Sequence, residues 1–276
     1  MRNLKFIAGA AVVGALVGIT AATAADLPAR TYTKAPVYVE PAFNWSGFYV
    51  GGNLGYSWGR SANTETLSDV RTGAVLDTGT SRNNVNGFIG GAQLGYNWQM
   101  SNWVAGIEAD IQGSGERGSS SLVCPGCGNG PSDITSTLTQ KLAWFGTVRG
   151  RAGVLVTPAV LLYGTGGLAY GEVDTAGSIA GQTLQGPGAV VFPSLTSTRV
   201  GWTAGAGIEG RIGGNWTAKL EYLYMDLGTA SFGPLATNIL VPVRANAGAS
   251  YSSHFTDNIL RVGVNYIFNA PVLAKY

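Results

Sequence analysis

Two cysteines have the spacing best suited to chemistry, in the run Cys124-Pro125-Gly126-Cys127. A Cys-x-x-Cys pair can serve in thiol–disulfide exchange or supply half of a zinc site. Exchange chemistry needs a helix N-terminus beside the thiol, and structural zinc needs four ligands; the neighbouring residues indicate neither. Because close cysteines in an oxidising compartment most simply join each other, we expect a Cys124–Cys127 disulfide at a loop tip, with free thiols as the alternative.

Two further signals point away from catalysis. His254 is the chain's single histidine, and nucleophilic catalysis needs a histidine with serine or acidic partners; we expect His254 to be a solvated residue at the end of a long loop. The run Gly205-Ala206-Gly207-Ile208-Glu209-Gly210 matches the dinucleotide fingerprint, but that motif must open a helix and here lies in an alternating segment. We therefore expect no enzyme, no cofactor and no metal.

Ten charged residues share one face of eight segments, seven of which alternate clearly between apolar and polar positions. The segments are residues 48–58, 88–98, 103–111, 141–154, 160–171, 200–212, 216–224 and 260–268. Segment 160–171 is apolar on both faces, so its register stays open. The charged residues, all opposite the apolar face, are Glu108, Asp110, Lys141, Arg149, Arg151, Glu209, Arg211, Lys219, Glu221 and Arg261.

The composition favours strands rather than helices. Charged residues are only 12% of the chain and there are 42 glycines, each of which costs a helix interior about 1 kcal/mol relative to alanine. A lysine or arginine that faces lipid at mid-bilayer costs about 2–4 kcal/mol. The pattern predicts an all-β, eight-stranded, antiparallel, up-and-down transmembrane β-barrel with its apolar face toward lipid and its charges in the lumen. A soluble barrel with the opposite orientation is the alternative.

The connections alternate in length as a transmembrane barrel requires. Short turns are expected at 99–102, 155–159 and 213–215, on the periplasmic side, and long outer loops at 59–84, 114–137, 174–198 and 227–255. Aromatic residues cluster at both ends of the segments, as in the girdles at bilayer interfaces. One group is Trp45, Trp98, Trp103, Trp216 and Phe268, and the other is Trp58, Phe88, Trp202 and Tyr224.

Both terminal segments of the chain are expected to lie outside the barrel. Residues 1–24 have the basic start, apolar stretch and small-x-small site of a signal peptide, with a retained anchor helix as the alternative. We expect a proline-interrupted periplasmic extension over 25–45, the barrel over 46–268 and a periplasmic tail over 269–276. After removal of Arg2 and Lys5, basic and acidic residues are equal in number, so no basic field for nucleic acid exists.

The lumen of an eight-stranded barrel is narrow enough for side chains to fill it. Charges that cannot reach bulk water must pair. We therefore predict an ion-paired plug in which Glu108 and Asp110 meet Arg149 and Arg151, and Glu209 meets Lys219. A plugged barrel that acts as a structural or surface protein through its loops is the favoured function, and a small porin with a narrow passage is the alternative.

Three segments carry a family resemblance. Asn44-Trp45-Ser46-Gly47-Phe48-Tyr49-Val50-Gly51-Gly52-Asn53-Leu54-Gly55-Tyr56, Gly164–Gly171 and the Pro271–Tyr276 tail resemble the small outer-membrane barrels of alpha-proteobacteria, the RopB-like and 31-kilodalton immunogenic class. The resemblance implies an abundant protein of the cell outer membrane, in contact with outer-membrane lipid and lipopolysaccharide, linked to envelope integrity and to host or surface ligands through its loops, and sometimes labelled a porin. Haemin binding in some members maps to no residue here.

The end of the last segment resembles the signal that the barrel assembly machinery reads on a final strand. In Arg261-Val262-Gly263-Val264-Asn265-Tyr266-Ile267-Phe268, the signal positions are Gly263, Tyr266 and Phe268. Such signals commonly end the chain, whereas eight residues follow Phe268 here. The role of that tail is left open.

Overall fold

A computed structural model describes residues 43–69, 72–124, 134–183, 186–236 and 247–268. The predicted signal peptide, most of the periplasmic extension, the C-terminal tail and Cys127 lie outside these ranges. The described chain consists of eight strands: β1 (Gly47–Asp69), β2 (Val75–Met100), β3 (Trp103–Cys124), β4 (Ile134–Thr157), β5 (Val160–Thr183), β6 (Gly186–Gly213), β7 (Trp216–Ala236) and β8 (Ala247–Phe268).

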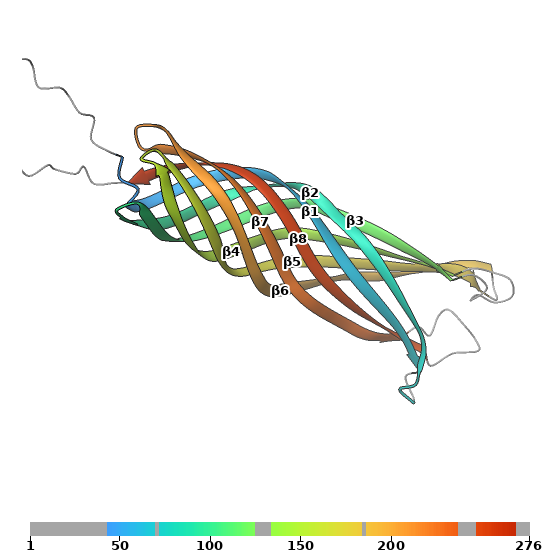
Figure 1. Cartoon of the computed structure of the whole chain (residues 1–276). Helices are drawn as coiled ribbons and strands as arrows, with labels where there is room; N and C mark the ends of the chain where they lie inside the picture. The colour runs from blue at the N-terminus through green and yellow to red at the C-terminus, as the bar shows by residue number, and fades with distance from the viewer. Residues whose placement is uncertain (1–42, 70–71, 125–133, 184–185, 237–246, 269–276) are drawn as a thin grey trace, which may run out of the picture. The chain divides into compact units, whose positions relative to one another are not determined.

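The strands form one closed ring. Each strand pairs antiparallel with the next, and β8 pairs with β1 in a register that sets Phe48 opposite Phe268. Figure 1 shows the strands winding obliquely around a common axis. The prediction of an eight-stranded antiparallel barrel is confirmed. Among the described residues, no helix is long and apolar enough to cross a membrane.

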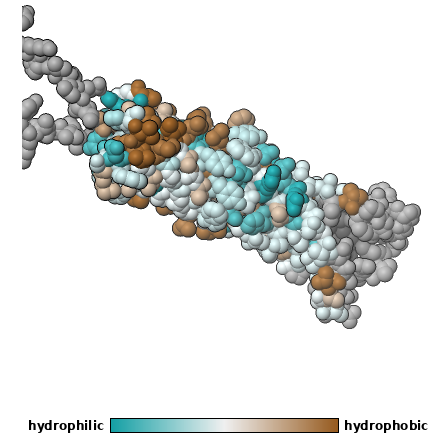
Figure 2. All heavy atoms as spheres, in the orientation of Figure 1, coloured by the Kyte–Doolittle hydropathy of each residue, from teal (hydrophilic) through white to brown (hydrophobic). Residues whose placement is uncertain are grey.

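The outward side of the ring is apolar. Along β1, Val50 and Leu54 are exposed, and Leu54 reaches 70% exposure, whereas Asn53 and Ser57, which alternate with them, are buried in the lumen. In Figure 2, brown apolar residues gather over the part of the barrel near the end of β8, and teal residues lie further along the visible face. Because such an apolar surface is unfavourable in water, it is the surface that meets lipid.

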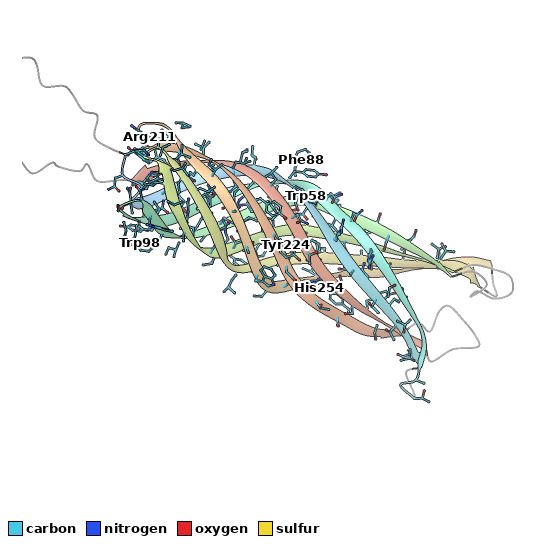
Figure 3. The ribbon with its side chains drawn as sticks, viewed as in Figure 1. Trp58, Phe88, Trp98, Arg211, Tyr224 and His254 are labelled. Atoms are coloured by element: carbon cyan, nitrogen blue, oxygen red, sulfur yellow. The ribbon has the colours of Figure 1, made fainter. Side chains whose placement is uncertain are left out.

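The turns and girdles lie where the sequence places them. β2 and β3, β4 and β5, and β6 and β7 are joined by connections of two residues each, and Gly214 in the last of these has φ +52, a conformation that favours glycine. Figure 3 places Trp98 at the short-turn end and Trp58, Phe88 and Tyr224 further along the barrel. Outward rings contact one another in both girdles, as in the pairs Tyr96–Trp98, Trp216–Tyr266, Tyr56–Phe88 and Trp202–Tyr224.

The strands are longer than the alternating segments predicted. Much of the sequence assigned to long outer loops instead continues the ladders, since β1 and β2 remain paired from Gly47 to Ser68. Antiparallel neighbours can keep exchanging backbone hydrogen bonds beyond the bilayer, so polar sequence does not end them. The structure also shows which face of segment 160–171 is inward. Leu161, Tyr163 and Ala169 are buried in the lumen, and Leu162 and Leu168 are exposed.

One assignment of facing is wrong. Leu142 was expected on the lipid side with Trp144, but it is fully buried. A β-bulge between Leu142 and Trp144 adds a residue on β4, and an extra residue reverses the alternation of faces. As a result Leu142 points into the lumen, and Lys141, next to it, lies on the outward face.

Candidate functional site in the barrel lumen

A layer of eight charged side chains crosses the lumen. Four are acidic and four are basic, and every one is at most 5% exposed. The acidic members are Glu108 and Asp110 of β3, Glu209 of β6 and Glu221 of β7; the basic members are Arg149 and Arg151 of β4, Lys219 of β7 and Arg261 of β8. We call this set the ionic layer. Its formal charge is zero, so no member is left without a counter-charge in the interior.

Glu108 is the centre of the ionic layer. All four basic members lie within ion-pair distance of its carboxylate: Arg149 in a short contact, Lys219 at 2.9 Å, Arg261 at 3.5 Å and Arg151 at 3.7 Å. These partners come from β4, β7 and β8, so the contacts span the lumen rather than follow one pair of strands. The phenol of Tyr49, on β1, also donates a hydrogen bond of 2.7 Å to Glu108.

The remaining acidic groups bind the same arginines. Arg149 and Arg261 lie 2.9 Å and 3.0 Å from Asp110, and 3.2 Å and 2.6 Å from Glu221. Pairing of Glu108 and Asp110 with Arg149 was predicted, and the structure brings these three together. The pair Glu209–Lys219 was expected, but Glu209 binds Arg151 at 2.6 Å and Lys219 binds Glu108.

Two of the ten charges predicted for the lumen lie outside the ionic layer. Lys141 faces outward because the β4 bulge reverses the alternation of faces there. Arg211 lies at the short-turn end (Figure 3), where its guanidinium stacks over the ring of Phe43 at 5.2 Å and its Nε donates to the carbonyl of Gly214 at 3.0 Å. Arg211 reaches the rim at the short-turn end because it lies only two residues before the end of β6.

Neutral side chains complete the hydrogen bonds of the ionic layer. Tyr163 of β5 donates to Glu221 at 3.0 Å, Thr147 donates to Asp110 at 2.9 Å, and Thr217 donates to Glu209 at 2.6 Å. Asn265 of β8 donates to Glu209 at 2.8 Å. Buried charges are tolerated only when paired and hydrogen-bonded, and this layer meets both conditions for most of its polar atoms.

Glycines make room for the arginines. Gly167 faces Arg149 across the β4–β5 ladder, and Gly55 faces Arg261 across the β1–β8 ladder. A methyl group at Gly167 would lie 2.1 Å from the carbonyl oxygen of Val148 and 2.7 Å from the Cα of Arg149; at Gly55 it would lie 2.7 Å from the Cβ of Arg261. A side chain at either glycine would collide with the backbone or the stem of the facing arginine, so each of these arginines has a residue without a side chain on one of its two neighbouring strands.

An aromatic and aliphatic cluster closes the lumen on the short-turn side of the ionic layer. Its buried members are Trp45, Tyr49, Val104, Leu155, Leu161, Tyr163 and Ile267. Trp45 is fully buried; its backbone N–H donates to Gln99 at 2.8 Å, and its indole N–H donates to the carbonyl of Pro158 at 3.2 Å. These bonds hold the residues just before β1 inside the mouth. We call this set the inner plug.

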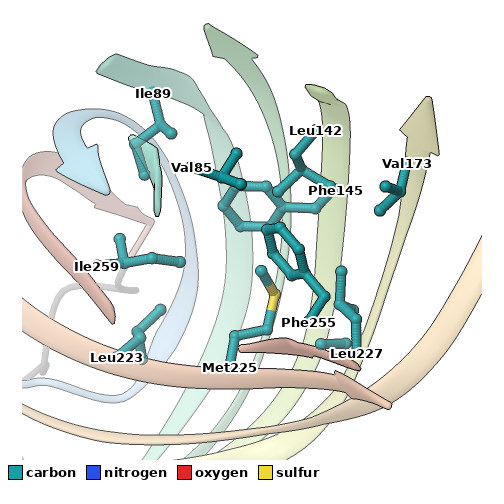
Figure 4. Close-up of a cluster of buried hydrophobic side chains, with 11 residues drawn as sticks. Val85, Ile89, Leu142, Phe145, Val173, Leu223, Met225, Leu227, Phe255 and Ile259 are labelled. Carbon is teal, nitrogen blue, oxygen red and sulfur yellow. The ribbon is translucent and has the colours of Figure 1, made fainter. Parts of the chain in front are cut away.

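A second apolar cluster fills the lumen on the outer side of the ionic layer. Figure 4 shows its side chains converging from opposite walls. The members are Val85, Ile89, Leu142, Phe145, Ala169, Val173, Leu223, Met225, Leu227, Phe255 and Ile259, and each is at most 3% exposed. We call this set the outer plug. This cluster was not predicted, because an apolar residue suits either face of the wall; only the alternation of Ile89 with the outward Phe88 indicated an inward side.

Further polar groups lie among and beyond the outer plug. Glu116 and Asp257 are both fully buried; Ser114 donates to Glu116 at 3.1 Å and Ser57 donates to Asp257. Arg199 is 4% exposed and donates to the carbonyl of Ser253 at 3.1 Å. Glu116 was not predicted to face the lumen because residues 114–137 were expected to form an outer loop, whereas β3 continues its alternation through Glu116.

Comparison with known families decides the class of this barrel. The model of the outer membrane protein beta-barrel domain matches residues 11–268. The chain belongs to this family. The 31 kDa outer-membrane immunogenic protein of Brucella melitensis is 36% identical over 90% of the chain and 94% of its own length, and the 22 kDa outer membrane protein of Rhizobium leguminosarum is 32% identical over 83% of the chain and 81% of its own length.

The resemblance drawn from sequence is therefore confirmed, and this outer-membrane barrel is a protein of the cell outer membrane. Among solved structures, the outer membrane protein OprG of Pseudomonas aeruginosa covers 84% of the chain and all of its own length, with 14% identity and a TM-score of 0.48. Because the long-turn ends of such barrels face the cell exterior, the outer plug lies toward the outside of the cell.

The other residues singled out in the sequence lie apart from the ionic layer. His254 was expected at a loop end, but it lies within β8 on the outward face; its Nδ1 is 3.0 Å from the hydroxyl of Thr229 and its Nε2 is 3.5 Å from Asp226. The Gly205–Gly210 run lies inside β6. Among the described residues, no group of three or more His, Cys, Asp or Glu side chains is placed to hold a metal ion.

The predicted assembly signal lies at the end of β8. Gly263 faces the lumen, whereas Tyr266 and Phe268 lie on the outward side, and Phe268 is the last residue of β8. Recognition by the barrel assembly machinery remains a prediction from sequence. Cys124 ends β3, and because Cys127 is not among the described residues, the disulfide also remains a prediction.

Proposed function

We propose that this outer-membrane barrel is a non-conducting structural and surface protein, which supports the envelope and presents its outer loops to ligands. The observation that carries the proposal is the filling of the lumen by three successive layers, the inner plug, the ionic layer and the outer plug. Any ion that crosses would have to pass between apolar side chains that are almost completely buried. Removal of water from an ion costs several kcal/mol, so such a path is closed to passive diffusion.

The arrangement does not favour an enzyme. The ionic layer is charge-balanced and its groups bind one another, so none of them is poised toward a substrate. The only histidine lies on the outward wall with Thr229 and Asp226, away from the lumen. The relatives are named as outer-membrane immunogenic proteins, which agrees with a surface role. The long ladders beyond the girdles would carry the connecting loops outward, where recognition residues commonly lie.

The closed lumen predicts an electrical result. Purified full-length protein inserted in a planar lipid bilayer should give no resolvable single-channel steps in molar potassium chloride, while a sixteen-stranded porin in the same bilayer should give steady openings. Heat-dependent migration in a detergent gel would establish that the inserted protein is folded. Steady, reproducible openings from the folded protein would contradict the proposal and favour the narrow porin.

A further inference from the structure

Four basic residues lie on the outward face of β1–β4, just beyond the outer girdle. They are Arg60 of β1, Arg82 of β2, Arg117 of β3 and Lys141 of β4. The three arginines are exposed, and Lys141 is half-buried. Arg60 follows Trp58 by two residues on the same face, which places it about 7 Å further along the strand. We call this set the basic patch.

The ladders bring these residues into one area. Arg60 faces Asn84 across the β1–β2 ladder, and Arg82 follows two residues beyond Asn84 on the same face. Arg117 faces Asn86 on one side and Lys141 on the other. The basic patch therefore spans four neighbouring strands: Arg117 and Lys141 face each other at the end of the β2–β3 ladder, and Arg60 and Arg82 lie beside it, two and four residues further along β1 and β2. Like charges directly opposite each other destabilise a sheet, so the Arg117–Lys141 pair is unfavourable unless an anion lies between them.

The protein itself supplies little compensation. Within the described ranges, no side-chain ion pair or hydrogen bond is formed by the four basic side chains. Asp174 of β5 lies opposite Lys141, but its carboxylate accepts a hydrogen bond of 2.7 Å from Thr196. The outward acidic groups beyond the girdle lie on β5 and β7, as Glu172, Asp174 and Asp226, and within the described ranges none of them forms an ion pair with the four basic side chains.

We infer that the basic patch binds the phosphate groups of a glycolipid of the outer leaflet. The lipid-facing surface ends at the girdle of Trp58 and Phe88, and the patch follows at once, at the height of the lipid headgroups. Arginine matches the geometry of phosphate oxygens with two parallel hydrogen bonds. Clusters of basic residues at a membrane surface attract anionic headgroups. The acyl chains would then lie along the apolar wall of β1–β4.

The test compares lipid A that carries its phosphates with the same lipid A after enzymatic removal of them. Binding to folded, detergent-purified, full-length protein would be measured by native mass spectrometry. The wild type should bind the phosphorylated form at least tenfold more tightly, since each basic group near a charged surface contributes on the order of a fivefold change and two such groups together already exceed tenfold. In the variant R60Q/R82Q/R117Q/K141Q this preference should fall to about onefold.

A matched variant separates the patch from general surface charge. E172Q/D226N changes outward charges of β5 and β7 that face no member of the patch and should keep the preference. Should the fourfold variant not fold, the two halves R60Q/R82Q and R117Q/K141Q should each lose part of it. A wild type without preference for the phosphorylated lipid, a fourfold variant that retains it, or displacement of the lipid by millimolar inorganic phosphate would each overturn the inference. This test is independent of the proposed function, because lipid binding at the outward face does not depend on whether the lumen conducts ions.

Discussion

Glu108→Gln is expected to lower the free energy of unfolding by about 3–5 kcal/mol, the usual cost of leaving a buried charge without its partner. Glu108 is the one carboxylate that all four basic members of the ionic layer approach. Glutamine has almost the same shape, so the loss is electrostatic. The layer would keep four cations and three anions, with no route to water. Urea unfolding in detergent, followed by heat-dependent gel migration, measures the change.

A second substitution tests the electrostatic cause. In Glu108→Gln/Lys219→Met, one cation leaves together with one anion, so the ionic layer is neutral again and more than half of the lost stability should return. Glu172→Gln, on the outward face, removes a carboxylate that is not buried and should change stability by less than about 0.5 kcal/mol. If Glu108→Gln behaves like Glu172→Gln, or if the double variant is less stable than Glu108→Gln alone, balance of charge is not what holds the layer together.

The architecture was predictable because one physical constraint acts on every strand. A charged side chain in hydrocarbon costs several kcal/mol, so Glu108 and Arg149 had to share the inward side while Leu54 and Val262 faced lipid. The short turns then fixed the strand order, since antiparallel neighbours joined by two residues leave no other pairing. The alternation of inward and outward residues repeats at a period of two along every strand, so it can be recognised from the sequence alone.

The partners within the lumen could not be read in the same way. Neighbouring strands suggested Glu209 with Lys219, which face each other in the β6–β7 ladder. Long side chains in a narrow barrel instead reach across the axis: Lys219 binds Glu108 of β3, and Arg151 binds Glu209 of β6. Cross-lumen contacts depend on the tilt and stagger of all eight strands together, which no local pattern contains.

Bulges and apolar inward residues account for the remaining errors. The extra residue near Trp144 shifts the alternation on β4, so Lys141 faces outward. Glu116 keeps the inward parity of Asp110 on β3, but it lies in a stretch that was expected to form an outer loop. The outer plug was not predicted because an apolar residue is compatible with either face of the wall. Only the even spacing between Ile89 and the inward Gln93 indicated that Ile89 also faces the lumen. The plug matters most for function, since it turns a charged lumen into a closed one.

Gly167→Val is expected to prevent closure of the barrel or to cost about 3 kcal/mol or more, because overpacking a close-packed interior forces the backbone to move. Gly167 lies opposite Arg149, and even a Cβ atom there would meet the carbonyl oxygen of Val148 at 2.1 Å and the Cα of Arg149 at 2.7 Å. Neither of these backbone atoms can rotate away. Displacing them would separate β4 from β5 beside the centre of the ionic layer. Loss of the fast-migrating band of unheated protein in a detergent gel measures the failure.

The neighbouring glycine provides the control, because it differs only in the side of the wall that it faces. At Gly166 the nearest atom to a new Cβ is the carbonyl oxygen of Thr203 at 3.6 Å, an ordinary contact, and the side chain would point to lipid. Gly166→Val should therefore give a folded barrel at least as stable as the wild type, since valine suits a lipid-facing strand. Gly167→Ala should lie between the two. If Gly166→Val and Gly167→Val fold equally well, there is space for a side chain beside Arg149. The narrow width of the barrel would then not be the reason that its interior is filled and non-conducting.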